Sequence, residues 1–184
     1  MLGEGNLGEG SAAELDRFFT GLSEYVFHSQ LGVVDTQLVD YVSDLLVRFS
    51  RTDTMHRVRM LDGRRATEVV AMVAEAEQRL GEARREVHRH IGDYTLFWTG
   101  VYPEALREMQ SKDTPDRFVS YCAQGKRAYR IASDISGESR QVSSDLLMRL
   151  SDQFEMCAYG LREIRREWER RDNDGSSDVP FLLM

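Results

Sequence analysis

Residues 69–97 read VVAMVAEAEQRLGEARREVHRHIGDYTLF, and an apolar side chain recurs there every three or four positions. Residues 150–168 repeat this spacing. Steps that alternate between four and three residues average the 3.5-residue period of helices packed lengthwise against partners. The two seams are Val69, Val73, Ala76, Leu80, Ala83, Val87, His90, Tyr94, Phe97 and Leu150, Phe154, Cys157, Leu161, Ile164, Trp168.

These seams predict two long helices, at about 66–98 and about 140–171, in an elongated all-α bundle of about five main helices. The other expected helices cover about 12–29, 38–49 and 116–133, with a short one at 103–110. The expected organisation is a flexible lead at 1–10, one helical-bundle domain at 11–171, and a flexible tail at 172–184 that ends in an apolar peptide.

Composition narrows the class of protein. The chain has 184 residues, of which 41% are hydrophobic and 30% charged, so one domain can bury a sizeable core. The formal charge of −7 makes nucleic acid an unlikely partner, although the arginine-rich end of the 140–171 helix offers a local basic strip. About 18 consecutive apolar residues occur nowhere, which predicts no membrane span.

Cys122 and Cys157 are too far apart for a CxxC motif, and both fall on apolar helix faces. This usage favours neither a disulfide framework nor a zinc ribbon, and it predicts a cytoplasmic protein. No GxSxG, Walker A or HExxH motif is present. The sequence therefore favours a protein without catalytic activity, with no cofactor expected.

Glu86 and His90 lie four residues apart and share a helical face, and His90 occupies a seam position that would suit an aliphatic residue. A buried imidazole needs partners for its nitrogens. Two interpretations stay open: a hydrogen-bonded core histidine that fixes helix register, or a ligand or proton-transfer group.

Glu24 and His28 repeat this Glu-x-x-x-His spacing. Two such pairs on neighbouring helices could build a carboxylate–imidazole site for a transition metal inside a bundle. The spacing is one residue longer than in di-iron bundles, and His28 also suits a helix C-terminus, where a cation is favoured. A metal site made by Glu24, His28, Glu86 and His90 is thus the alternative to a structural role.

Aromatic residues are concentrated on the expected helices at about 66–98 and 116–133. If these helices pack together, the aromatic side chains either form the wide end of a core or line a ligand pocket. The candidates for a ligand site or a polar core are His90, Glu86, Asp93, Tyr94, Trp98, Tyr121 and Tyr129.

Two segments together carry a pattern of spaced residues: 90–106, HIGDYTLFWTGVYPEAL, and 121–129, YCAQGKRAY. The pattern is Gly-Asp-x-x-Leu-Phe-x-x-Gly, then Pro-Glu, then Tyr-x-x-x-Gly-x-x-Ala-Tyr, and it resembles a family of uncharacterised bacterial helical proteins with no known activity. The resemblance implies a bacterial origin. In physical terms, Gly92 permits tight packing, and Asp93 can accept hydrogen bonds from backbone amides or from a tyrosine hydroxyl.

The leading functional expectation is a non-catalytic protein-interaction module, a scaffold, adaptor or regulator. It would act through its heptad-like faces, first as a homodimer, because the seams look too long for one small core to cover. A flexible apolar peptide can also dock into a groove on a partner. The expected docking residues are Phe181, Leu182, Leu183 and Met184. The alternative is a metal- or small-cofactor-binding bundle.

Overall fold

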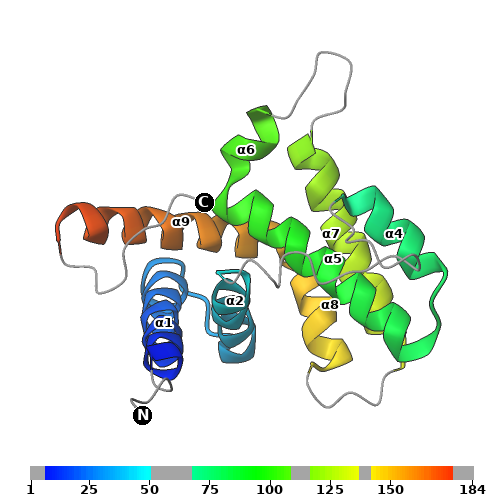
Figure 1. Cartoon of the computed structure of the whole chain (residues 1–184), viewed down its shortest axis with the longest axis horizontal. Coiled ribbons are helices and arrows are strands. Elements are labelled where there is room, and N and C mark those ends of the chain that lie inside the picture. The colour runs from blue at the N-terminus through cyan, green and yellow to red at the C-terminus, as the bar shows by residue number, and fades with distance from the viewer. Residues whose placement is uncertain (1–6, 51–67, 109–116, 137–141, 176–184) are drawn as a thin grey trace, which may run out of the picture.

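The computed structural model describes residues 7–50, 68–108, 117–136 and 142–175, and these residues form helices and short connections without any strand (Figure 1). The all-α prediction is confirmed for them. The order of elements is α1 (Leu7–Glu24), the π-helix η1 (Tyr25–Gln30), α2 (Thr36–Phe49), α4 (Val69–Glu77), α5 (Gly81–Val101), α6 (Pro103–Glu108), α7 (Arg117–Asp134), α8 (Ser144–Asp152) and α9 (Phe154–Asn173).

The predicted long helix at 66–98 is wrong. The chain leaves the helix after Glu77, and Leu80 adopts an extended conformation before α5 begins at Gly81. Gly81 has a φ of +54°, which a residue without a Cβ adopts at little cost. As a result α4 folds back and lies beside α5 instead of continuing it (Figure 1).

The predicted long helix at 140–171 is also wrong. Gln153 leaves the helical conformation, with φ −108° and ψ 22°, and separates α8 from α9. The two helices then run in different directions (Figure 1). The apolar spacing continues across the break because Leu150 and Phe154 are both fully buried on either side of it.

The N-terminal boundary differs as well, because α1 begins at Leu7 and not near residue 12, so the helix includes two glycines of the predicted flexible lead. Its last turn widens into η1, which turns Val26 and Phe27 into the core. The remaining shorter helices lie close to their predicted positions. The C-terminal peptide 181–184 lies outside the described residues.

Helix α5 runs through the middle of the molecule and contacts α4, α7, α9 and α2, while α1 and α2 pack together on one side of it (Figure 1). One apolar core joins all of these helices. Most of both seams is inside it, including Val87, Tyr94 and Phe97 of the first and Phe154, Leu161 and Ile164 of the second. The premise that a single chain cannot cover its seams is therefore wrong.

Side chains cap the first turns of α2 and α8, and one of these caps also joins the two helices. The Asp35 carboxylate accepts the Leu38 amide at 3.1 Å, and the Ser143 hydroxyl accepts the Leu146 amide at 3.1 Å. Arg149 of α8 forms an ion pair with Asp35.

No helix within the described part of the chain is both long enough and apolar enough to span a bilayer.

Candidate functional site

Asp93 is a fully buried carboxylate in the middle of α5. The preceding residue, Gly92, leaves space for the ring of Tyr129, because a Cβ built on Gly92 would lie 2.6 Å from that ring. Tyr129 of α7 can therefore approach α5 closely enough for its hydroxyl to reach the carboxylate. This is the tight packing expected of Gly92.

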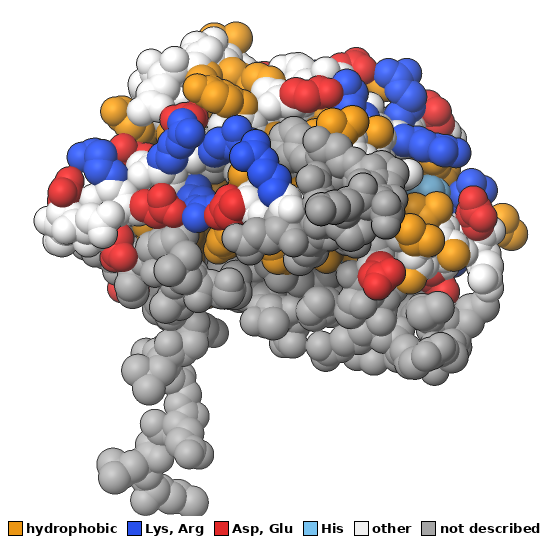
Figure 2. All heavy atoms as spheres, turned by 90° about the horizontal axis from the view of Figure 1, so that it is seen from above, with side chains coloured by type: hydrophobic (Ala, Val, Ile, Leu, Met, Phe, Trp, Pro, Cys, Tyr) orange, Lys and Arg blue, Asp and Glu red, His pale blue; other side chains and the backbone are white. Residues whose placement is uncertain are grey.

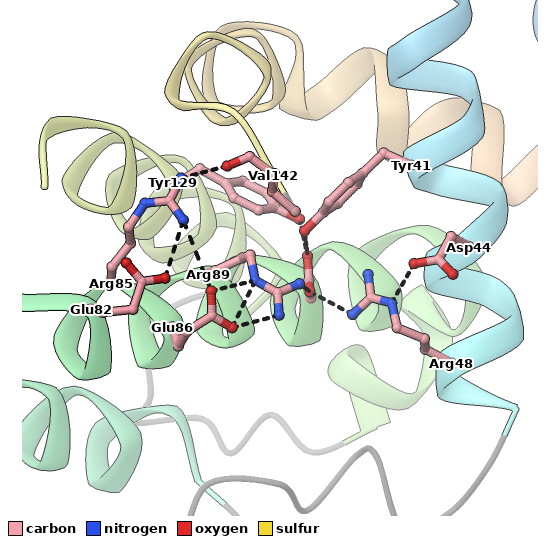
Figure 3. A network of polar contacts seen from close by, with 10 residues as sticks. Tyr41, Asp44, Arg48, Glu82, Arg85, Glu86, Arg89, Tyr129 and Val142 are labelled. Atoms are coloured by element: carbon pink, nitrogen blue, oxygen red, sulfur yellow. Dashed lines mark hydrogen bonds and ion pairs between the residues drawn. The ribbon is translucent and has the colours of Figure 1, made fainter. Parts of the chain in front are cut away.

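Four donors from three helices surround this carboxylate (Figure 3). The hydroxyls of Tyr41 and Tyr129 donate to Asp93 Oδ1 at 2.6 and 2.8 Å. Arg48 Nη1 donates to Oδ2 at 2.9 Å, and Arg89 Nη1 lies 3.4 Å from the same oxygen. A carboxylate offers about four acceptor positions, so Asp93 has no remaining capacity to take up a proton from a substrate.

The charges of this Asp93 network are mutually stabilised. Burial by itself would raise the pKa of Asp93, but the charges of Arg48 and Arg89 and the donated hydrogen bonds outweigh it and hold the pKa below its usual value. Burial and the adjacent Asp93 charge raise the pKa of both Tyr41 and Tyr129, so the two hydroxyls stay protonated as donors. The network is a fixed ionic junction between α2, α5 and α7.

Further charged groups extend the junction outward. Glu86 accepts from Arg89 Nη2 at 2.7 Å, and Asp44 accepts from Arg48 Nε at 2.7 Å. Arg85, only 2% exposed, donates to the carbonyl oxygen of Val142 at 2.7 Å and so joins α5 to the segment before α8 (Figure 3).

Of the residues proposed from the sequence, Asp93 and Tyr129 meet in this network. The aromatic candidates form a separate packed row: the rings of Tyr94 and Trp98 lie 6.2 Å apart, and those of Tyr94 and Tyr121 lie 6.5 Å apart. His90 is buried and stacks on Phe49 at 5.9 Å. These contacts place the aromatic candidates in the core.

The Glu/His pairs do not assemble. His28 Nδ1 donates to the carbonyl oxygen of Val33 at 2.5 Å, near the end of η1, while Glu24 is exposed. Within the described residues, no three His, Cys, Asp or Glu side chains come together as metal ligands, so Glu24, His28, Glu86 and His90 do not form the expected set. Neither Cys122 nor Cys157 forms a disulfide within the described residues, and burial raises the pKa of Cys157 to about 12.

Tyr41, Arg48 and Arg89 were not identified from the sequence. Tyr41 is 52 residues away from Asp93 along the chain, and an arginine on an amphipathic helix normally indicates a solvent-facing side. One local signal did exist, since Arg85, Arg89 and Asp93 follow each other at four-residue intervals on one helical face.

An arginine-rich cleft of about 300 Å³ lies at another place, between the end of α5, α6 and α9. Its charged walls are Glu104, Arg107, Arg162, Arg165, Arg166 and Glu169, so arginines outnumber glutamates by two. We refer to it as the arginine cleft.

Arg165 is held firmly in the wall of this cleft. Its Nη1 donates to the carbonyl oxygen of Val101 at 2.6 Å, its Nε donates to Glu169 at 2.7 Å, and its guanidinium lies 5.0 Å from the centre of the Tyr102 ring. Arg107, by contrast, is exposed and has no ion-pair partner within the described residues. One arginine thus shapes the cleft while another is available to a ligand.

No protein-family model matches this sequence, and neither the curated proteins nor the solved structures contain a match to the chain.

Proposed function

We propose that this protein is a non-catalytic interaction module that binds an acidic segment of a protein partner in the arginine cleft. The observation that carries the proposal is the excess of arginines in this cleft, on a chain whose formal charge is −7. A positive site on a negative protein attracts acidic ligands selectively, because the remaining surface repels them.

The geometry of the cleft supports protein as the partner class. Guanidinium groups bind carboxylates in pairs of parallel hydrogen bonds, and Val101 and Pro103 add apolar wall for a peptide backbone. A duplex or single-stranded nucleic acid would need a longer positive track. Outside the cleft, Arg170 and Arg171 of α9 both form ion pairs with Glu167.

Figure 2 looks down on the molecule from above and shows Asp and Glu side chains near the Lys and Arg side chains on the described part of the surface. The positive charge on this part of the face is thus partly balanced. A second copy of this chain is one such acidic partner, because the chain has a formal charge of −7. Binding of that copy in the arginine cleft would form the homodimer expected from the sequence.

The test is a binding titration with a fluorescent peptide rich in Asp and Glu, followed by anisotropy, against a peptide in which Asn and Gln replace the acids. The double variant Arg107→Glu/Arg166→Glu is expected to weaken binding at least about tenfold, because it reverses two charges in the cleft. Arg130→Glu is the matched control, since Arg130 is an exposed arginine of α7, far along the chain from the cleft. Its effect should stay below about twofold.

Equal binding of the neutral peptide, or equal loss in Arg130→Glu, would contradict the proposal. So would tighter binding of a single-stranded oligonucleotide than of the acidic peptide, which would assign the cleft to nucleic acid. Sedimentation of the wild-type chain and of the double variant tests the homodimer, because self-association through the cleft should be lost in the variant.

A further inference from the structure

A second, smaller cavity of about 140 Å³ lies between α4, α5 and α7, on the side of α5 that faces α4. Its polar walls are Glu77 from α4, Arg84 and His88 from α5, and Gln124 and Arg127 from α7. We refer to it as the His88 pocket. It shares no residue with the arginine cleft.

His88 is 4% exposed, and its Nε2 has no hydrogen-bond partner within the described residues. Buried imidazole nitrogens nearly always have a hydrogen-bond partner, because without one the free-energy cost of removing the nitrogen from water is not offset. The side chain lines the cavity, so a ligand in the cavity can supply the missing acceptor.

The two arginines of the pocket also lack side-chain partners among the described residues. Neither Arg84 nor Arg127 has a hydrogen bond or an ion pair to any side chain in the described segments, and the buried Nε of Arg84 is unsatisfied. Glu77 lines the same cavity but pairs with neither of them. Two positive charges and one negative charge leave a net positive pocket.

These charges act on the histidine. Burial first, and then the charges of Arg84 and Arg127, lower the pKa of His88 to about 4, so its ring is neutral near pH 7. An anion placed between the three groups would cancel this repulsion, and the pKa of His88 would rise on binding.

We propose that the His88 pocket binds a small tetrahedral oxyanion, with Arg84 and Arg127 as its charge partners and His88 Nε2–H as a hydrogen-bond donor. The volume of the cavity suits an ion of the size of sulfate or phosphate. Gln124 can donate a further hydrogen bond from its amide. This site is independent of the proposed function, because none of its groups lies in the arginine cleft.

Sulfate is the most informative probe, since its charge stays at −2 throughout the pH range in which the protein groups titrate. A calorimetric titration of the full chain with sodium sulfate, at ionic strength matched with chloride, should give saturable binding. Arg84→Gln and Arg127→Gln should each weaken it at least about tenfold. Arg130→Gln, on the same helix as Arg127 but outside the pocket, should change it less than about twofold.

The pH dependence separates His88 from the arginines. Binding should tighten at least about threefold between pH 7 and pH 5, because the anion favours protonated His88. This gain should vanish in His88→Gln and persist in Glu77→Gln, which removes the other titrating group of the pocket. The imidazole resonance of His88, assigned by its absence in His88→Gln, should show a higher pKa in sulfate than in chloride.

A comparison of inorganic phosphate with a simple phosphate monoester identifies the source of the anion. Tighter binding of the ion supports a free oxyanion, and equal binding supports the phosphoryl end of a larger molecule. Several outcomes would overturn the proposal: no saturable binding of sulfate or phosphate to wild type, equal weakening by Arg130→Gln, or an unchanged His88 pKa at saturation.

Discussion

Two faces of the same helix carry buried charge in opposite ways. On one face of α5, Arg85, Arg89 and Asp93 all have hydrogen-bond partners, and those of Asp93 include side chains of α2 and α7. On another face, Arg84 and His88 are one position away in sequence and have no partner within the described residues. Both sets lie within residues 84–93 of one helix, so local sequence composition does not distinguish them.

The difference between the two faces lies in how many hydrogen-bond partners the charged and polar groups have. Asp93 has all its acceptor positions filled from α2, α5 and α7, and removing any member leaves an uncompensated buried group. In the His88 pocket, His88 Nε2 and Arg84 Nε have no hydrogen-bond partner in the part of the chain that the structure describes. A saturated set holds helices together, whereas an unsaturated set beside a cavity indicates a ligand.

The largest effect should come from breaking the saturated face. Asp93→Ala leaves the buried Arg89 and the half-buried Arg48 without their shared carboxylate, and we expect a loss of about 3–5 kcal/mol in the free energy of unfolding. Urea denaturation measures it. Asp152→Ala, which removes an exposed partner of Arg130, should cost less than about 1 kcal/mol. A similar small loss in both variants would show that the network contributes little.

A smaller effect should follow from tightening the same junction sterically. In Gly92→Ala the new Cβ meets the buried ring of Tyr129 at 2.6 Å, and the ring cannot retreat without leaving Asp93. We expect a loss of about 1–3 kcal/mol. Gly21→Ala is the matched control within a helix, because nothing lies within 4 Å of its Cβ, and it should stabilise the protein by up to about 1 kcal/mol. Destabilisation by Gly21→Ala, or none by Gly92→Ala, would refute this packing.

A third effect distinguishes the two faces by their response to acid. The pKa of His88 is lowered from 6.5 to about 4, so the unfolded chain binds more protons between these values and stability falls there as the pH decreases. The pKa of Asp93 is lowered from 3.8, so its contribution is complete above about pH 4 and is lost only below it, as the pH falls through its folded value.

Urea midpoints measured across both pH ranges test this. His88→Gln should lose less stability than wild type between about pH 6.5 and pH 4 and should follow it below that range. Identical curves for the variant and the wild type in the upper range would show that His88 does not have a lowered pKa.

The sequence predicted the helical class and the positions of the shorter helices, because amphipathic spacing is a local feature of the chain. It did not predict the breaks at Leu80 and Gln153. The apolar spacing runs through both of them, since residues on each side face the same core, and periodicity alone does not record a change of direction.

For the site, Gly92, Asp93 and Tyr129 were singled out because they belong to the sequence pattern of residues 90–106 and 121–129, in which the acid can accept a hydrogen bond from a tyrosine hydroxyl. Arg48 and Tyr41 were not, because their meeting with Asp93 depends on how α2 crosses α5. His88 resembled any polar residue of an exposed face. Only the tertiary structure reveals that its ring is enclosed beside two arginines.

The packing of η1 against α9 bears on how the chain is made. Phe27 sits where a Cβ at Gly160 would lie 2.2 Å from its ring, and Trp168 meets Phe19 at 5.1 Å. These side chains of α1 and η1 are therefore covered by α9, which follows every other described helix in the chain. Until α9 emerges, Phe19 and Phe27 stay exposed on a nascent chain, where chaperones that bind apolar surface can reach them.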